Sequence, residues 1–308
     1  MANLIYIAGF LLIGLLLQRS RQFPQNTGQV LNAYVIYVAL PALVLQKIPA
    51  LTVSTALIIP AIMPWVLLLL TVPVILLLAR RLAWSSATTA CMLIVVPLGN
   101  TSFVGFPMIE ALVGEAGIPY ALLYDQLGSF LILSIYATFV VAIYASREGQ
   151  SARPKLRPIL LKILRFPPFI ALIAALVLKS WDYHPILASF IDSLAVTLVP
   201  VIMVAVGFQL KFRLAAEDRQ PFVWALVLKL VLTPLVAMLL IWPLGFDSLV
   251  HQVTILEAAM PAMISAGALA IMAGLAPTLA AAVVGYGVLL CLVTLPLWAM
   301  LLNYLANF

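Results

Sequence analysis

The chain has 308 residues, of which 65% are hydrophobic and only 8% are charged, with a formal net charge of +6. A soluble domain carries about 25% charged residues, so this composition excludes an ordinary soluble protein and indicates an integral membrane protein. At about 20 apolar residues per membrane span, it suits about ten helices. The run 1–17 does not resemble a signal peptide, because Arg19 and Arg21 follow its apolar part instead of preceding it.

Ten apolar stretches predict ten membrane-spanning helices, which makes the expected fold an all-α polytopic one. In chain order they are 3–18, 28–47, 55–79, 85–112, 118–144, 167–180, 189–210, 220–243, 248–274 and 277–305. The sixth stretch is short, and it begins near Ile159 if Pro167 and Pro168 only kink the helix. Almost no sequence is left for a soluble domain.

Basic residues are concentrated in the links that follow the odd-numbered spans, where 13 of the 16 Lys and Arg residues lie. The opposite links hold only Lys47 and Lys179, and Lys229 lies within the eighth span. By the positive-inside rule, the odd-numbered links are cytoplasmic and both termini are outside. We therefore expect a multi-pass protein of the cell inner membrane. The same placement explains the positive charge without any role for nucleic acid.

The longest polar link, residues 146–166, divides the chain into two similar halves, 1–145 and 167–308. Prolines recur between the halves at offsets of 159, 161 and 158 residues: Pro41 with Pro200, Pro73 with Pro234, and Pro119 with Pro277. Each half holds five spans, and because five is odd the second half enters the membrane upside down. This pattern predicts the inverted repeat of secondary transporters.

The fourth and ninth predicted spans are both interrupted in mid-membrane. Residues 97–107 read PLGNTSFVGFP, with two prolines and two glycines around a polar triplet. Lipid offers no hydrogen-bond partner, so such a break is tolerated only inside protein or beside a watery cavity. The ninth span carries Glu257 and Pro261 among small residues at the corresponding place. Broken helices at matching places in two halves point to a transport site at the bilayer midplane.

The side chains beside these breaks are the candidates for binding a substrate. Polar groups next to an opened backbone can hold a carboxylate or a cation, and the alternative is that they only cap half-helices and join neighbouring spans. The candidates are Asn100, Thr101, Ser102, Met260, Pro261 and Ser265.

Ionisable residues inside the spans are the candidates for coupling transport to an ion. A carboxylate in mid-membrane costs several kcal/mol unless it is paired, protonated or ion-bound. We expect Glu257 and Asp125 to carry this role, helped by Asn100 and Gln126. The structural alternatives are that Glu257 pairs with Lys229 and that Asp125 is solvated at a vestibule mouth. Lys229 itself either snorkels to the interface or acts as a counter-ion.

Catalytic motifs are absent from the sequence. There is no Walker A motif, no HExxH, no GxSxG and no Cys/His cluster, so we predict neither an enzyme nor an ATP-driven pump. Cys91 and Cys291 lie within predicted spans, where they are expected to be small buried hydrophobic residues. No cofactor is expected apart from H⁺ or Na⁺ as the coupling ion.

Two segments resemble motifs of a known family. Residues 99–107, GNTSFVGFP, resemble the fourth-span motif of the auxin efflux carrier family of permeases, and residues 257–262, EAAMPA, resemble its ninth-span motif. Residues 31–45 and 122–130 are similar to it as well. The resemblance covers essentially the whole chain and identifies it as similar to bacterial members. Ala262 replaces a second proline that is typical of the family, which predicts a milder break in the ninth span.

The resemblance implies a ten-helix fold shared with bile-acid sodium symporters and sodium/proton antiporters. Spans 1, 2, 6 and 7 would form a scaffold panel, and spans 3–5 and 8–10 a mobile core in which broken spans 4 and 9 cross. Asn100 and Pro261 would then lie beside an organic anion. Asn100 and Glu257 match the positions of an Asn and a Glu that bind sodium in the related symporters, so a sodium site is expected there.

We therefore expect a secondary transporter that moves a small organic anion, an auxin-like or malate/malonate-like carboxylate, by alternating access. Its partners would be this anion and the lipid bilayer, with a homodimer left open. One alternative is a cation/proton antiporter without an organic substrate, although Asp125 is the only acid of the triplet 124–126. The other is a non-transporting receptor, which would need an attached signalling domain or a long tail.

Overall fold

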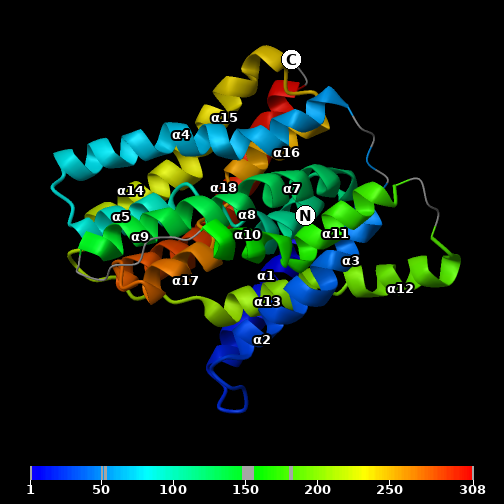
Figure 1. Ribbon diagram of the computed structural model, residues 1–308, viewed down its shortest axis with the longest axis horizontal. Coiled ribbons are helices and arrows are strands. Elements are labelled where there is room, and N and C mark those ends of the chain that lie inside the picture. The colour runs from blue at the N-terminus through cyan, green and yellow to red at the C-terminus, as the bar shows by residue number, and fades with distance from the viewer. Residues whose placement is uncertain (1, 50, 52–53, 148–155, 180–182, 307–308) are drawn as a thin grey trace.

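The computed structural model describes the chain except for residues 1, 50, 52–53, 148–155, 180–182 and 307–308. All regular elements of the described residues are helices (Figure 1). The one strand-like contact among them is an isolated antiparallel bridge between Gly99 and Ala262. Within the described chain, 6 helical stretches are long and apolar enough to cross a membrane, or up to 7 if a bent pair counts as one span. The prediction of an all-α polytopic protein is confirmed at this level.

The first half of the chain contains three continuous apolar stretches, Thr27–Lys47, Thr55–Arg81 and Glu115–Tyr144, and one interrupted helix. Its elements are α1 (Ala2–Gln18), α2 (Thr27–Tyr34), η1 (Val35–Ala39), α3 (Leu40–Lys47), η2 (Thr55–Leu57), α4 (Ile58–Arg81), α5 (Ser86–Val95), η3 (Thr101–Gly105), α6 (Phe106–Leu112), η4 (Glu115–Gly117), α7 (Ile118–Leu123), η5 (Tyr124–Ser129), α8 (Phe130–Ile132), η6 (Leu133–Ala137) and α9 (Thr138–Arg147). The interrupted helix consists of α5, the residues 96–100, and η3 with α6.

The second half also contains three continuous stretches, Pro185–Gln209, Arg219–Leu244 and Pro277–Ala306, and a second interrupted helix. Its elements are α10 (Leu156–Leu164), α11 (Pro167–Val177), α12 (Pro185–Ala195), α13 (Leu198–Gln209), α14 (Arg219–Val227), η7 (Leu228–Leu232), α15 (Thr233–Ile241), η8 (Trp242–Leu244), α16 (Leu249–Ala258), α17 (Ile264–Met272) and α18 (Pro277–Ala306). The interrupted helix consists of α16, the residues 259–263, and α17.

The link expected at 146–166 differs from the prediction, because it contains a helix. Helix α10 packs Ile159 and Ile163 against Phe130 of α8. A bend of 59° separates α10 from α11, so Pro167 and Pro168 do more than kink a single span. A proline at the start of a helix needs no N–H partner, which suits Pro167 to open a new helix at this corner.

Three prolines follow a widened helical turn of the π type. The turns η1, η3 and η7 each end two residues before a proline, at Pro41, Pro107 and Pro234 respectively. Proline lacks an N–H and its ring crowds the carbonyl four residues earlier, and a π turn relieves that crowding. The hydroxyl of Thr233, the first residue of α15, donates to the carbonyl of Leu228 in η7 at 2.7 Å, beside the backbone N–H of the same threonine.

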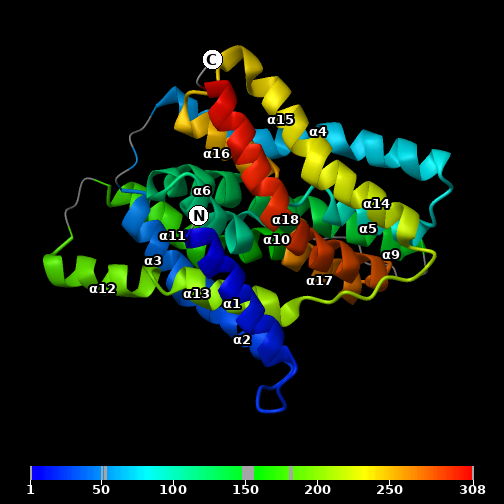
Figure 2. The same cartoon turned by 180° about the vertical axis from the view of Figure 1, so that it is seen from behind.

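The helices gather in two groups, which Figures 1 and 2 show in the lower and upper parts of the molecule. In the lower group α1 packs along α13, α13 contacts α2, and α3 contacts α11 and α12. The approach of α1 to α13 depends on Gly14 and Gly207, because a Cβ on either would collide with the carbonyl of Val204 or of Leu11. In the upper group α4 contacts η5 and α16, and α14 contacts α18.

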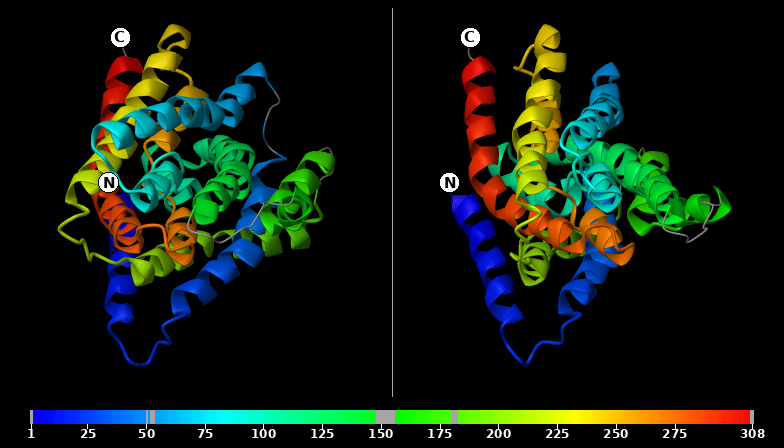
Figure 3. Two further views of the ribbon diagram at one scale, coloured as in Figure 1. Left: turned by 60° about the vertical axis from the view of Figure 1, so that its left-hand side comes forward. Right: turned by 90° about the vertical axis from the view of Figure 1, so that its left-hand side faces the viewer.

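The outer faces of the helices are apolar, as lipid contact requires. Leu69 of α4, Ile186 of α12 and Val293 of α18 are among the exposed large hydrophobic side chains. Figure 3 shows α1 and α18, the first and last helices, along the same side of the molecule, and the loop after α1 projecting from the lower end.

Candidate functional site

The two interrupted helices contact each other through their backbones. Asn100 donates its N–H to the carbonyl of Pro261 at 2.8 Å, and Met263 donates its N–H to the carbonyl of Leu98 at 2.9 Å. These hydrogen bonds flank the bridge between Gly99 and Ala262. Each break therefore supplies the partners that the other lacks, as a membrane-buried backbone must. We call residues 97–105 and 257–263 the crossing.

The two interruptions have the same length, five residues each, at 96–100 and 259–263. The prediction of a milder break in the ninth span is therefore wrong. Pro261 has no N–H group that needs an acceptor, and the N–H groups of Asn100 and Met263 are satisfied by carbonyls of the opposite break. One proline is enough here because hydrogen bonds to the other interrupted helix, rather than a second proline, hold the break open.

Asn100 begins the second half of the first interrupted helix. Its Oδ1 accepts from the N–H of Phe103 at 3.3 Å, which caps η3 in the way an Asn caps a helix. Its Nδ2 is buried and has no hydrogen-bond partner among the described residues. An unsatisfied buried donor costs about 1–3 kcal/mol. The amide therefore offers an unused donor in the crossing.

Asp125 of η5 lies against the same break. The Thr101 hydroxyl donates to Oδ1 at 2.6 Å and the Gln126 amide donates to Oδ2 at 2.7 Å. Ser102 lies within hydrogen-bonding reach of the same carboxylate. Asp125 is only 3% exposed, so the alternative of a solvated residue at a vestibule mouth is wrong. The amide oxygen of Gln126 stays buried without a described partner.

Glu257 lies in the last turn of α16 and is completely buried. Neither carboxylate oxygen has a hydrogen-bond partner among the described residues. The carboxylate presses against Gly105, where a Cβ would come within 2.7 Å of Oε2. A glycine at 105 therefore makes room for it. A buried carboxylate without partners is costly when charged, so this group is suited to binding a proton or a metal cation.

Lys229 of η7 reaches the crossing from the eighth predicted span. Its Nζ donates to the carbonyl of Ala258 at 3.3 Å, and its side chain is buried. Gly99 lies beside it, since a Cβ there would come within 3.1 Å of Nζ. The snorkelling alternative is therefore wrong. Among the described residues Lys229 and Glu257 do not form a direct ion pair, so the simple structural pair is wrong as well.

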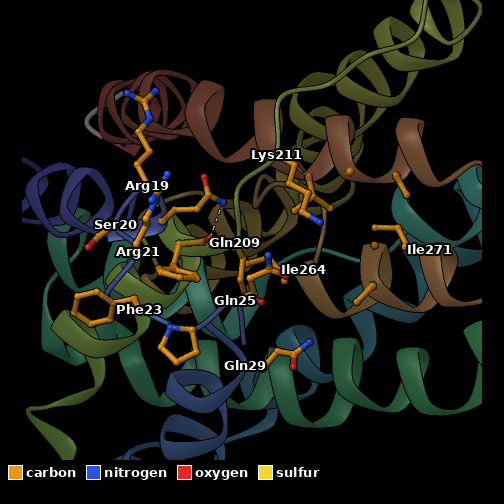
Figure 4. Close-up of a pocket in the computed structure, with 18 residues that line it drawn as sticks. Arg19, Ser20, Arg21, Phe23, Gln25, Gln29, Gln209, Lys211, Ile264 and Ile271 are labelled. Atoms are coloured by element: carbon orange, nitrogen blue, oxygen red, sulfur yellow. Dashed lines mark hydrogen bonds between the residues drawn. The ribbon is translucent and has the colours of Figure 1, made fainter. Parts of the chain in front are cut away.

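A large cavity of about 880 Å³ opens on the side of the link after α1. It lies between that link and the end of α13 on one side and α17 and α18 on the other. Figure 4 shows Arg19 and Arg21 at one end and Ile271 at the other, with Gln209 and Lys211 between them. Ile264, which follows the second break directly, also lines it, so the cavity approaches the crossing.

A smaller cavity of about 300 Å³ lies on the opposite side of the crossing, between α1, α3, α6 and α12. Two polar contacts hold its mouth. Lys47 of α3 pairs with Glu115 of η4 at 2.7 Å, and Gln46 donates to Asp192 of α12 at 2.8 Å. The cavity lined by Arg19 and Arg21 is thus larger than the cavity lined by Lys47 and Glu115.

The chain is similar in sequence to known transport proteins. The model of a family described as "Membrane transport protein" matches residues 1–299. The chain belongs to this family, that of the auxin efflux carriers. An uncharacterised transporter of Methanothermobacter thermautotrophicus is 28% identical over 295 residues, 94% of each chain. An uncharacterised transporter of Methanocaldococcus jannaschii is 24% identical over 246 residues, 77% of each chain.

Most of the candidates predicted for this transporter lie at the crossing. Met260 and Pro261 are buried in the second break, beside the polar residues of the first. Ser265 is different. It is exposed, one residue into α17, and makes none of the hydrogen bonds described for the other candidates. The sequence predicts for Lys229 either a counter-ion or a snorkelling side chain. A lysine inside an apolar span is itself a signal of function.

Proposed function

We propose that this transporter is a secondary carrier that moves a small organic anion, an auxin-like or malate/malonate-like carboxylate, by alternating access. The observation that carries the proposal is the unpaired buried Nδ2 of Asn100 between two interrupted helices. A carboxylate is the natural partner for such a donor, because hydrogen bonds to a charged acceptor are stronger than neutral ones.

Helix ends strengthen the preference for an anion. The helix Thr101–Leu112 and the helix α17 both begin at the crossing, so their N-terminal N–H groups point toward it. A helix N-terminus behaves as about half a positive charge. Half-helix N-termini hold the anionic groups of substrates in other transporters with broken helices. Asn100, Thr101, Ser102, Met260 and Pro261 would surround the anion.

The large cavity supplies a path suited to an anion. Arg19, Arg21 and Lys211 line it, and no acidic side chain of the described residues does. A cavity lined with one sign of charge raises the local concentration of the opposite sign. We place this side in the cytoplasm of the cell inner membrane, because it carries the basic links, and both termini outside.

Coupling to an ion gradient would depend on Glu257, with Asp125, Gln126 and Asn100 nearby. Glu257 has both oxygens free of described partners, so it can take up a proton or help to bind Na⁺ together with Oδ1 of Asn100. Asp125 already accepts from Thr101 and Gln126 and is less free to change its charge. Glu257 is therefore the first candidate for the coupling group.

Alternation would come from movement between two bodies. Each body would combine spans from both of the inverted five-span repeats. Spans 1, 2, 6 and 7 would form a panel that includes α1, α3 and α13, and the other spans a core that includes the crossing. Both cavities lie where panel helices face core helices, such as α6, α17 and α18. Closing one cavity while the other opens would expose Asn100 to each side in turn.

The decisive experiment measures uptake of labelled malonate, malate and indole-3-acetate into proteoliposomes. We expect uptake of at least one of them by the wild type and a large loss in Asn100→Ala. The control is Asn26→Ala, which removes an exposed Asn whose side chain caps no helix. Equal uptake by Asn100→Ala and the wild type would remove Asn100 from the site. No uptake of any carboxylate by the wild type would overturn the proposal.

A cation/proton antiporter is the second candidate, because two buried carboxylates, Asp125 and Glu257, lie at the crossing. It predicts that a cation gradient changes the pH inside vesicles and that added carboxylates have no effect on this change. The carrier hypothesis predicts that no proton movement occurs without the organic anion.

A further inference from the structure

The crossing contains a buried lysine side chain. Lys229 extends from η7 and ends between the two breaks, with its Nζ on the carbonyl of Ala258 and beside the Cα of Gly99. It is 3% exposed. The nearest acidic groups on neighbouring elements are Glu257 of α16, which it does not pair with directly, and Asp125 of η5, which already has its own donors.

The place that this ammonium occupies is one that favours cations. Ala258 is the last residue of α16, and the carbonyls at a helix C-terminus carry about half a negative charge. Unwound carbonyls and half-helix C-terminal ends coordinate coupling sodium ions in transporters with broken helices. Glu257, one residue earlier, adds a carboxylate to the same turn. An ammonium and a sodium ion would compete for this position.

The positive charge of Lys229 does more than satisfy the carbonyl of Ala258. A neutral hydroxyl can donate to a carbonyl at lower cost, as the hydroxyl of Thr233 does to the carbonyl of Leu228, which also accepts the N–H of Thr233. Burying an ammonium costs several kcal/mol unless negative charge surrounds it. The chain also keeps Gly99 free of a side chain at the point where a Cβ would crowd Nζ. Both features favour a role for the charge itself.

We propose that Lys229 is the resident cation of the crossing, taking the place of a coupling sodium ion at the carbonyl end of α16. This inference deepens the proposed function and rests on it for its meaning in transport. It leaves the proton as the coupling ion and makes sodium unnecessary. Removal of the ammonium should open a site in which Na⁺ can bind between the Ala258 carbonyl and the Glu257 carboxylate.

The first test measures thermal unfolding of the purified protein in NaCl and in choline chloride at equal ionic strength. We expect the same Tm for the wild type in both salts. Lys229→Ala should have a lower Tm in choline chloride, and Na⁺ should raise it in a concentration-dependent way, because a ligand that binds only the folded state stabilises it. The matched control is Thr233→Val, which removes the neutral cap of Leu228 and should lower Tm equally in both salts.

A second variant tests the inference without removal of the lysine. Gly99→Ala should displace the ammonium by a few tenths of an ångström and produce a smaller sodium response than Lys229→Ala does. This variant decides the matter if Lys229→Ala fails to fold. A wild type that Na⁺ stabilises, or variants at both positions with no sodium response, would overturn the inference.

Uptake measurements separate this inference from the proposed function. We expect equal wild-type uptake of carboxylate in sodium and choline media, and uptake by Lys229→Ala that is lower by about tenfold in choline, a loss of about 1.4 kcal/mol. Part of it should return in sodium. Wild-type uptake that requires sodium overturns the inference and leaves the carrier function intact. If no carboxylate is transported, the carrier function fails, and the sodium response of Tm still decides the role of Lys229.

Discussion

The two breaks at the crossing have equal lengths and share hydrogen bonds, yet they differ in chemistry. The first, around Asn100, carries neutral polar side chains, whereas the second carries the apolar residues Met260, Pro261 and Ala262. Buried charge flanks both breaks: Asp125 lies against the first and is held by two donors, whereas Glu257 in the preceding turn and Lys229 from η7 flank the second. The comparison suggests a division of labour in which the first break recognises the substrate and the second handles charge.

The degree of hydrogen bonding supports this division. At the first break Thr101 and Asn100 Oδ1 are satisfied, and the Nδ2 of Asn100 has no partner among the described residues. At the second break both oxygens of Glu257 have no described partner. A satisfied network keeps its geometry, which recognition requires. An unsatisfied carboxylate can change its charge without breaking a hydrogen bond, which coupling requires.

The largest effect should follow from Glu257→Gln, which keeps the shape of the side chain and removes its ability to change charge. We expect gradient-driven accumulation of the anion to fall by about 100-fold, equivalent to about 2.7 kcal/mol, while exchange of labelled for unlabelled substrate continues. Uptake and exchange in the same proteoliposomes measure the two activities.

The control for this change is Glu217→Gln, which alters an exposed carboxylate outside the helices. It should leave both activities unchanged. If Glu257→Gln accumulates the anion as the wild type does, the second break does not handle the coupling charge. If exchange is lost together with accumulation, Glu257 contributes to substrate binding as well. Recognition of the substrate would then not be confined to the first break.

The next largest effect should follow from Asn100→Asp, a change that separates capping from recognition. Aspartate keeps an oxygen that can cap η3, so the fold should survive, but it replaces the free donor by an acceptor. We expect the anion to bind about 10- to 100-fold more weakly, since a hydrogen bond to a charged group contributes about 1.5–3 kcal/mol. Ligand-dependent thermal stabilisation gives the affinity. Unchanged affinity with an unchanged Tm would show that the amide only caps the helix.

The crossing is the part of this protein that its sequence predicts best. A proline and a glycine close before Asn100 weaken a helix, and lipid cannot satisfy the backbone groups that a break frees, so protein has to cover it. The same reasoning selects Asp125 and Glu257, because an ionisable group in mid-membrane is expensive wherever it lies. These conclusions depend only on the local sequence and on the solvent.

Other features depend on contacts between distant segments and could not be predicted. The reach of Lys229 to Ala258 depends on how η7 packs against α16, which no local pattern fixes. The equal length of the two breaks depends on the bridge to Gly99, so the loss of a proline at Ala262 was misleading. Ser265 is exposed although it is only the second residue of α17, because a difference of one residue changes the face of the helix.

Stability should respond to Thr101→Val more than transport does. Valine matches the shape of threonine but leaves Oδ1 of Asp125 without the donor that now lies at 2.6 Å. We expect the free energy of unfolding to fall by about 1–2 kcal/mol, because a buried acceptor loses its partner. Thermal unfolding in detergent measures the change, and Ser102→Ala, at a less buried position, should cost less. An equal cost for both would mean that Asp125 is not held mainly by Thr101.

The smallest effect should follow from Arg21→Ala, because this side chain lies in the large cavity and outside the crossing. An exposed charge attracts the anion over a distance and forms no fixed contact with it, so its contribution is screened by salt. We expect KM for the anion to rise about two- to threefold at low ionic strength, with kcat unchanged, and the difference to vanish at high ionic strength. Arg80→Ala is the control, since Arg80 lies at the end of α4 and does not line the cavity. A salt-independent loss in Arg21→Ala would mean that Arg21 binds the anion directly, and recognition would then extend beyond the first break.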